Sequence, residues 1–323
     1  ELEKIILRKN AAKCDSQPSE YGVDEIDEET LKEFVQRANN SNRIKFEYAG
    51  KKETLDKLNL LKGERITNAG VLLFSKNKPI TLQAAVFAGN DKNTFIDISD
   101  FEGNIFQLMK EEETYLKAHI NWRAVLQDRT RKEIPEVPLR ALTEVIVNSF
   151  CHRDYQSHQN NNAAVYKSTI SIWNPGDFPE GFEPKDFIKQ KLPSMPRNPE
   201  IAKMLFLSAD IEKWGSGLKR IHDECITNKV KVNFKTIKTG FSVDFSRRTN
   251  VPENVPENVP EERFSKILDL IKQNNRLTAI ELSAHFNVTE KTIKRDLQNL
   301  KKKGLLKRVG PDKGGYWKVS KKH

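Results

Sequence analysis

The stretch EVIVNSFCHRD, residues 144–154, combines the apolar pattern of a buried helix with three polar residues. Glu144, Asn148 and His152 are spaced four residues apart, so they share one helix face at 3.6 residues per turn, and Arg140 extends this line by one turn. Buried polar groups need hydrogen-bond partners. The line therefore predicts either a satisfied polar network in a core or a site that meets a ligand.

The ligand alternative is a site for a metal ion and a phosphorylated molecule. Asn148 would offer a neutral oxygen to Mg²⁺, which retains water molecules and takes few protein ligands. His152 would meet a phosphate, and Glu144 would orient or deprotonate a water molecule. The spacing by itself leaves both alternatives open.

Two later segments favour the ligand alternative. Residues 163–178 read as two strands that end in the turn Asn174-Pro175-Gly176, and glycine there lets a backbone approach a ligand closely. Asn198 and Pro199 then mark a helix start. Gly215-Ser216-Gly217 precedes the next helix. Such a loop can hold phosphate at a helix N-terminus, although a plain turn between helices has the same pattern.

Four motifs in this order carry a resemblance to a known family: LTEVIVNSFCHRDY, SIWNPGDFP, MPRNPEIA and IEKWGSGLKRI. They resemble the RecG-C-terminal-like version of the GHKL nucleotide-binding domain, which gyrase, histidine kinases and MutL share. The resemblance covers about residues 10–245. It is typical of predicted transcriptional regulators with a Schlafen/AlbA-like domain in front, and it implies an α/β sandwich that binds ATP and Mg²⁺.

The resemblance assigns expected roles to the polar line of the opening stretch. Glu144 falls on the water-activating, catalytic position of the family. Asn148 falls on the position of the magnesium ligand, and His152 on a position beside the phosphates. Hydrolysis of ATP stays open, because the glycine boxes depart from the family pattern.

Those departures concern both sides of the expected nucleotide. Asn174 stands where the family has an adenine-reading Asp, and Gly176 follows it without a second glycine. Gly215-Ser216-Gly217 matches the second glycine box, whose backbone N–H groups meet the phosphates. The segment 178–214 would serve as a lid, with Arg197 as its best candidate for a phosphate contact.

The N-terminal part mixes helix and strand signals. Residues 64–77, ERITNAGVLLFSKN, resemble the latter half of a Schlafen/AlbA-like domain, and the chain is expected to begin inside that domain. The patterns predict a helix over 26–38, strands over 69–74 and 81–89, and helix from 101 to 131. The chain has three cysteines and no C-x-x-C pair, which disfavours a disulfide framework or zinc site and favours a reducing cytoplasm.

The excess positive charge is confined to the C-terminus. Residues 262–323 hold 16 Lys and Arg against 6 Asp and Glu, which is the whole net charge of +10, so residues 1–261 are neutral. The repeated VPEN before this region forbids a regular helix or central strand and predicts an extended spacer. A basic module after a spacer indicates binding to nucleic acid.

The basic module has the pattern of a winged helix-turn-helix of the kind found in bacterial repressors. Helices are predicted over 263–273, 277–286 and from Thr289 as N-cap to Gly304, followed by a hairpin around Pro-Asp-Lys-Gly-Gly. The third helix would enter the major groove of double-stranded DNA while the wing contacts phosphates. The candidate DNA-binding residues are Lys291, Thr292, Lys294, Arg295, Gln298, Lys301, Lys302, Lys307 and Arg308.

Together these observations predict a mixed α/β (α+β) multidomain chain. The expected parts are a partial Schlafen/AlbA-like domain (1–95), a GHKL-like domain (96–248), a linker (249–261) and a winged helix (262–323). The expected function is a DNA-binding transcriptional regulator, a homodimer, with an ATP-binding sensor. The alternatives are an ATPase of a nucleic-acid-processing or defence system and a degenerate nucleotide domain that serves as a dimerisation scaffold. No apolar run is long enough for a membrane span. No P-loop exists, which argues against a helicase.

Overall fold

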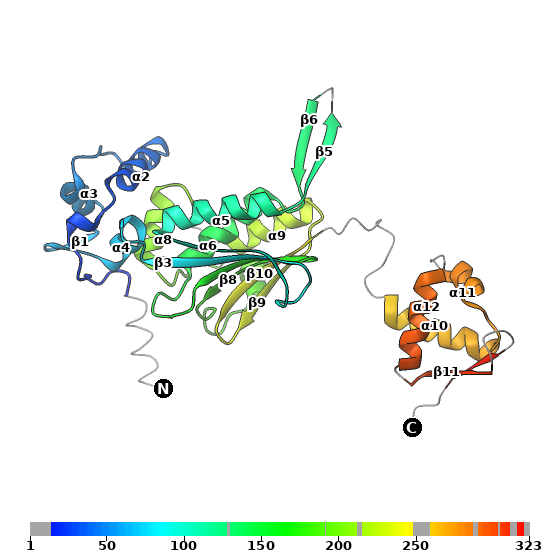
Figure 1. Ribbon diagram of the computed structural model, residues 1–323. Coiled ribbons are helices and arrows are strands. Elements are labelled where there is room, and N and C mark those ends of the chain that lie inside the picture. The colour runs from blue at the N-terminus through cyan, green and yellow to red at the C-terminus, as the bar shows by residue number, and fades with distance from the viewer. Residues whose placement is uncertain are drawn as a thin grey trace. The chain divides into compact units, whose positions relative to one another are not determined.

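The computed structural model describes residues 14–127, 130–190, 192–211, 215–247, 259–286, 290–302, 304–310 and 315–319. The chain divides into two compact units, Glu1–Thr249 and Asn250–His323, and Figure 1 shows the elements of each. Most of the predicted spacer (249–261), namely residues 249–258, lies outside the described residues. Its last part was expected to be extended, but helix α10 begins at Val259. Proline in the first turn of a helix is tolerated because its missing N–H has no partner there anyway.

Unit 1 is built on one six-stranded mixed sheet in the order β4-β3-β7-β8-β10-β9. Only β3 and β7 are parallel; the other neighbours in the sheet are antiparallel. The strands are β3 (Ile80–Phe87), β4 (Phe95–Gly103), β7 (Asn161–Val165), β8 (Thr169–Pro175), β9 (Val232–Ile237) and β10 (Gly240–Ser246).

Three helices cover one face of this sheet, as Figure 1 shows. They are α5 (Ile105–His119), α6 (Leu139–Cys151) and α9 (Gly217–Thr227). Residues 144–151 of the opening stretch therefore lie in α6, which begins at Leu139 as predicted. The helix ends at Cys151, so His152, expected within it, is its C-cap residue. Its apolar residues, such as Val145, Ile146 and Phe150, are buried in the core beside the strand residues Ile170 and Ile172. The predicted mixed α/β class is confirmed.

The N-terminal part differs from the sequence prediction in two places. Residues 69–74 lie in helix α4 (Asn68–Phe74) and not in a strand, because the Thr67 hydroxyl accepts the N–H of Gly70 as an N-cap. The expected domain boundary at residues 95 and 96 falls where β4 begins, and β4 pairs with β3. Since β3 also pairs with β7, residues 80–95 belong to the same sheet as the later strands.

The other N-terminal helices are the short 3-10 helix η1 (Val23–Glu25), α2 (Glu28–Asn40) and α3 (Lys51–Lys57). Helix α2 matches the predicted helix over 26–38, with Asp27 as its N-cap. A two-residue ladder joins the strands β1 (Leu61–Lys62) and β2 (Arg65–Ile66).

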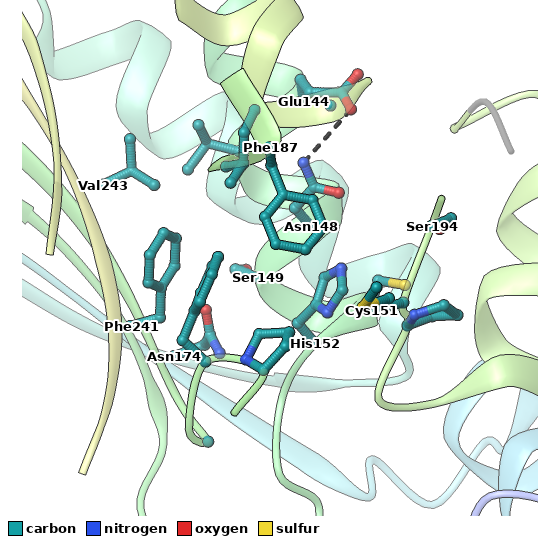
Figure 2. A pocket seen from close by; sticks show the side chains of 18 of the residues that line it. Glu144, Asn148, Ser149, Cys151, His152, Asn174, Phe187, Ser194, Phe241 and Val243 are labelled. Carbon is teal, nitrogen blue, oxygen red and sulfur yellow. Dashed lines mark hydrogen bonds between the residues drawn. The ribbon is translucent and has the colours of Figure 1, made fainter. Parts of the chain in front are cut away.

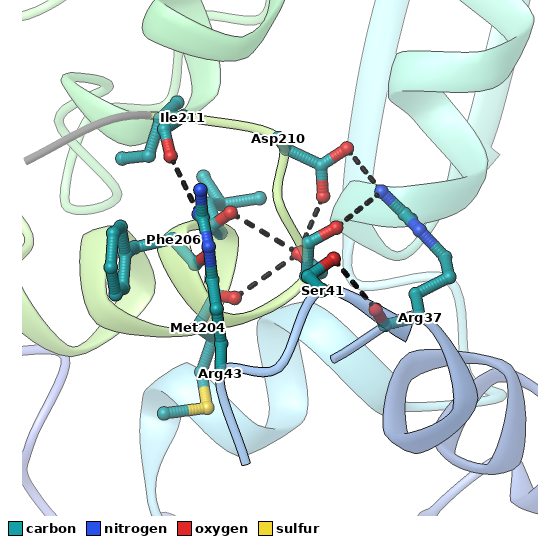
Figure 3. Close-up of polar contacts among 9 residues, drawn as sticks. Arg37, Ser41, Arg43, Met204, Phe206, Asp210 and Ile211 are labelled. Carbon is teal, nitrogen blue, oxygen red and sulfur yellow. Dashed lines mark hydrogen bonds and ion pairs between the residues drawn. The ribbon is translucent and has the colours of Figure 1, made fainter. Parts of the chain in front are cut away.

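The N-terminal part holds a later helix, α8 (Pro199–Leu207), at both ends. The Asp15 carboxylate accepts the backbone N–H groups of Glu200 and Ile201 at the start of α8. At the other end, Arg37 donates to the carbonyl of Ser208, and Arg43 donates to the carbonyls of Phe206 and Ile211 (Figure 3). Negative charge at the start and positive charge at the end are the signs that a helix dipole favours.

The region 101–131 was expected to be helical, but only its middle is. Strand β4 ends at Gly103, and Asn104 begins α5 with a capping box to Gln107. After His119 the chain forms a two-stranded hairpin, β5 (Trp122–Gln127) with β6 (Thr130–Pro135), which projects from the body of unit 1 in Figure 1. Strand β5 and the start of β6 thus stand where the last helical turns were predicted.

Arg247, the last described residue of unit 1, is fixed at the base of the hairpin. Its backbone N–H donates to the carbonyl of Ser168 at 2.8 Å. Its guanidinium donates to the Glu136 carboxylate at 2.9 Å, to the carbonyl of Tyr166 at 2.8 Å and to that of His119 at 3.5 Å. The Glu136 side chain is almost fully buried. The end of β10 is thus tied to the segment between the hairpin and α6.

Unit 2 is a three-helix domain with a two-stranded hairpin. Its elements are α10 (Val259–Gln273), α11 (Ala279–Phe286), α12 (Glu290–Lys302), β11 (Leu306–Val309) and β12 (Tyr316–Val319). Ile267, Ile293 and Leu297 are among the residues of a core separate from that of unit 1. The Trp317 indole N–H donates to the carbonyl of Leu277, which ties the hairpin to the loop before α11. The helix-turn-helix with a wing is therefore present as predicted.

Candidate functional site

A pocket in unit 1 lies between helices α6 and α9, strands β8 and β10, and the residues Gly176 to Pro179, Phe187 and Ser194 to Pro196. Figure 2 shows Glu144, Asn148 and His152 along one side of it, with Asn174 and Phe241 opposite. Seven of the nine predicted catalytic and cofactor residues line this one pocket: Glu144, Asn148, His152, Asn174, Gly176, Gly215 and Gly217.

The inner part of the pocket is apolar. Val145, Ile172 and Val243 line it from the helix and the sheet. Phe178 packs against Phe241, with ring centroids 5.2 Å apart, and edge-on against the ring of Phe187 from the short helix α7 (Pro184–Lys189). A flat, largely apolar ring system is the kind of ligand group that such a lining accommodates.

The opposite part of the pocket is polar and closely packed. An Arg220 guanidinium nitrogen donates to both oxygens of Glu144, at 2.9 and 3.0 Å. The amide of Asn148 donates to the same carboxylate at 3.4 Å. Arg220 also donates to the hydroxyl of Ser216 at 3.0 Å. A Cβ atom on Gly217 would lie 2.7 Å from Glu144 Oε1 and 3.1 Å from Asn148 Nδ2, so any other residue there would displace these two side chains.

The first glycine turn lines another part of the pocket, through Asn174 and Gly176. Gly176 has a φ of +121°, and a Cβ atom there would lie 3.1 Å from the carbonyl oxygen of His152 and from the N–H nitrogen of Asp154. The Asn174 side chain is buried, and its amide donates to the carbonyl of Pro175. The glycine therefore lets β8 end in contact with the C-terminus of α6.

Arg197 lies beside this turn and does not line the main pocket. Its guanidinium donates to the carbonyl of Asp177 at 2.8 Å, and it lines a neighbouring cavity together with Asp15 and Asp154. Burial, with the nearby Arg197 charge, lowers the pKa of His152 to about 4. At neutral pH His152 is thus an uncharged hydrogen-bonding group rather than a cation.

The second glycine turn packs closely against the backbone of residues Leu192 to Ser194. Gly215 has a φ of +68°, and a Cβ atom there would lie 2.5 Å from the carbonyl oxygen of Leu192. Ser216 is the N-cap residue of α9 and meets Arg220 instead of lining the pocket. Arg140, the first residue of the polar line, lies on the surface with Glu224 as its ion-pair partner.

The residue that sequence reasoning missed is Arg220. It stands in the first turn of α9, four residues after Ser216, and its partner Glu144 is 76 residues earlier. No local spacing indicates such a pair. A cation in the first turn of a helix is the unfavourable sign for the helix dipole, and this is the one signal that pointed to it.

The described residues contain no group of three His, Cys, Asp or Glu side chains that could hold a metal ion. A bound Mg²⁺ would depend on the amide oxygen of Asn148, water and phosphate oxygens, which suits an ion that takes few protein ligands. Because the Asn148 amide nitrogen already donates to Glu144, its oxygen is the atom left for a cation. The residues present therefore fit Mg²⁺ with a phosphorylated ligand.

Comparison with protein families identifies two classes of domain in the chain. Residues 161–245 match the family described as "Putative ATP-dependent DNA helicase recG C-terminal". Residues 263–317 match the DeoR-like helix-turn-helix domain. The chain thus combines a RecG-C-terminal-like, ATPase-type domain with a DNA-binding helix-turn-helix, as the motifs predicted. Residues 4–87 match a domain of unknown function, DUF8451, and the Schlafen/AlbA-like assignment stays a prediction.

A solved structure is similar over most of the chain. It is the crystal structure of the DIP2311 protein from Corynebacterium diphtheriae, with 17% identity and a TM-score of 0.61. The match covers 95% of this chain and 64% of that one, so the present chain spans about two thirds of that protein. This likeness shows a shared fold. No curated protein matches the chain in sequence, and no described helix is long and apolar enough to cross a membrane.

The candidate DNA-contacting surface of unit 2 is α12 with the wing. Arg295, Gln298 and Lys301 are exposed on α12, and so is Lys294, which also pairs with Glu290. On the wing, Lys307 is exposed and Arg308 stacks over the ring of Trp317 at 4.7 Å. The side chains of three further candidates lie outside the described residues: Lys291, Thr292 and Lys302.

Proposed function

We propose that this protein is a DNA-binding transcriptional regulator whose ATPase-type domain binds an adenine nucleotide with Mg²⁺. The observation that carries the proposal is the gathering of both glycine turns and the polar line of α6 around one pocket. The apolar part between Val145, Ile172 and Phe241 would take the base. The polar part at Asn148 and Gly217 would take the phosphates.

In this proposal Glu144 is the residue that would activate water for hydrolysis. Its carboxylate is held by Arg220 through both oxygens, which leaves it poorly placed to accept a proton. The proposal therefore favours a binding and sensing role over fast turnover. The ATPase alternative requires Arg220 to release Glu144 when the nucleotide is bound.

Calorimetric titration with ATP and Mg²⁺ tests the nucleotide site. We expect binding by the unaltered protein and at least about tenfold weaker Mg²⁺-dependent binding by Asn148→Ala. Asn233→Ala, an exposed asparagine on β9, is the matched control and should bind normally. Equal affinity of the protein and Asn148→Ala, with or without Mg²⁺, would remove the proposed site.

Fluorescence anisotropy with duplex DNA tests the other half of the proposal. Lys307→Ala should weaken binding by a few-fold for all sequences and lower the slope of log affinity against log salt by about one. Lys62→Ala in unit 1 serves as the control for a lost surface charge. Repeating the titration with ATP and Mg²⁺ tests coupling, and identical curves over a range of salt would separate the two functions.

A further inference from the structure

Strand β4 is an edge strand with exposed apolar side chains. It pairs with β3 on one side, and the sheet order places no other described strand beside it. Phe95, Ile96 and Ile98 are 50%, 68% and 64% exposed. An exposed, apolar edge of nine residues invites pairing with another strand.

The opposite edge of the sheet lacks this character. Strand β9 is six residues long, and Lys235 near its centre forms an ion pair with Asp244 at 2.6 Å. Lys231 and Lys238 flank it. Lysines are a common protection of edge strands, whereas the sequence of β4, FIDISDFEG, contains neither lysine nor proline.

The exposed isoleucines lie on the face of β4 that points away from the helices. Ile98 stands opposite Ala85 of β3. On the helix-covered face, Asp97 accepts the Tyr115 hydroxyl at 2.6 Å and Phe101 packs edge-on against the Tyr115 ring. Pairing along the free edge would therefore leave the contacts with α5 intact.

We propose that β4 pairs antiparallel with β4 of a second copy of this chain, around a two-fold axis that passes near Asp97. In this register Ile96 lies opposite the partner subunit's Ile98, and the reverse, so four isoleucines form one apolar cluster. Glu102, at the acidic end of the strand, then lies opposite the loop that holds the partner subunit's Lys92, which is exposed.

This complementarity is what selects a second copy as the occupant. On the face of β4 that points away from the helices, the first half carries Ile96 and Ile98, and the second half carries Asp100 and Glu102. An antiparallel copy therefore places isoleucine beside isoleucine and Glu102 opposite the partner subunit's Lys92. The unfavourable contact is between the two Asp97 carboxylates at the axis, and the Tyr115 hydroxyl donates to each. The joined sheet would be continuous through both subunits. Only the role of the pairing rests on the proposed function: the dimer would bring two winged helices to two half-sites on DNA.

Sedimentation equilibrium of the full chain tests the pairing without nucleotide or DNA, so its outcome is independent of the proposed function. We expect twice the chain mass of 37.2 kDa at micromolar concentration. The double variant Ile96→Lys/Ile98→Lys should dissociate at least about 100-fold more readily, because like charges would meet in the cluster. Ile237→Lys on β9 is the matched control and should stay dimeric, and circular dichroism should report an unchanged fold for all three.

A monomeric unaltered protein, or a double variant that stays dimeric, overturns the proposal. Hydrogen exchange identifies the alternative occupant, because protection in a monomer of the β4 amides that point away from β3 would mean that another part of the same chain covers the edge. A charge reversal tests the register. Lys92→Glu should weaken the dimer, and Lys92→Glu/Glu102→Lys should restore it, whereas failure to restore would overturn this register.

Discussion

The two sides of the pocket are held in different ways. The helices α6 and α9 are joined by the ion pair between Arg220 and Glu144, whose carboxylate belongs to a residue that lines the pocket. Helix α8, which supplies Ala202 to the lining, is held from outside by Asp15, Arg37 and Arg43. The first side can rearrange when a ligand competes for its charges, whereas the second is part of the scaffold. The difference indicates that the N-terminal part supports the pocket without lining its main cavity.

The largest expected effect concerns Glu112 on α5, the helix that packs against α6. It is fully buried, neither carboxylate oxygen has a partner among the described residues, and burial raises its pKa to about 8. The native state therefore favours the protonated carboxyl group. The contribution of Glu112 to the free energy of unfolding is fully present below the ordinary pKa of 4.5 and is lost as the pH rises through about 8. The loss amounts to roughly 5 kcal/mol of unfolding free energy.

Urea unfolding at several pH values measures this effect. Glu112→Gln should abolish the decline in stability between pH 5 and 9, because the amide does not ionise. Glu111→Gln, its exposed neighbour, should keep the decline of the unaltered protein. A flat profile for the unaltered protein would show that the carboxyl group finds a partner or water at high pH.

The next largest effect is expected from removing the contacts that hold the C-terminal end of α8. Arg43→Ala removes donors to the carbonyls of Phe206 and Ile211 and a stacking contact 4.1 Å from the Phe206 ring. We expect a loss of about 2–3 kcal/mol in the free energy of unfolding, since hydrogen bonds from a charged group are strong. Arg65→Ala, at an exposed arginine, should change it by less than about 0.5 kcal/mol.

Removing the contact between α6 and α9 should lower the free energy of unfolding by less than removing the Arg43 contacts with α8. Arg220→Gln should lower the unfolding free energy by about 1 kcal/mol, because the pocket lets water replace the lost partner of Glu144. Lys219→Gln, whose exposed pair with Asp223 is on the same helix, is the control. If Arg220→Gln destabilised the protein more than Arg43→Ala, the distinction between a rearrangeable side and a scaffold side would be wrong.

The smallest effect is expected at the start of α8. Burial raises the pKa of Asp15 above its ordinary 3.8, against three backbone N–H groups, those of Glu200, Ile201 and Ser16, that lower it. Asp15→Asn therefore loses a favourable charge at the helix start and also relieves a buried charge, so the net change at pH 7 should stay within about 1 kcal/mol. The variant should lose the decline in stability that the unaltered protein shows as pH rises above 3.8. Asp24→Asn, at an exposed aspartate, should retain it.

Local sequence patterns predicted the parts of the site that depend on neighbours in the chain. Helical spacing predicted the polar line that begins in α6. Apolar runs that end in a turn signal predicted strands β7 and β8, and glycines predicted both turns, where φ is positive. The pairing of Arg220 with Glu144 and the contacts of Arg43 with α8 did not follow, since their partners are 76 and 163 residues apart. Residues 69–74 were assigned to a strand because a short apolar run has no readable period.

The fixation of Arg247 has a mechanical consequence. A tension transmitted through the segment that follows it would be met by the Glu136 carboxylate and the carbonyls of Tyr166 and His119. These contacts belong to three different stretches of unit 1 and would have to yield before β10 could be peeled from the sheet. Pulling on the C-terminal domain, for example by a DNA molecule under strain, would thus be borne by the hairpin base and would leave the pocket undisturbed.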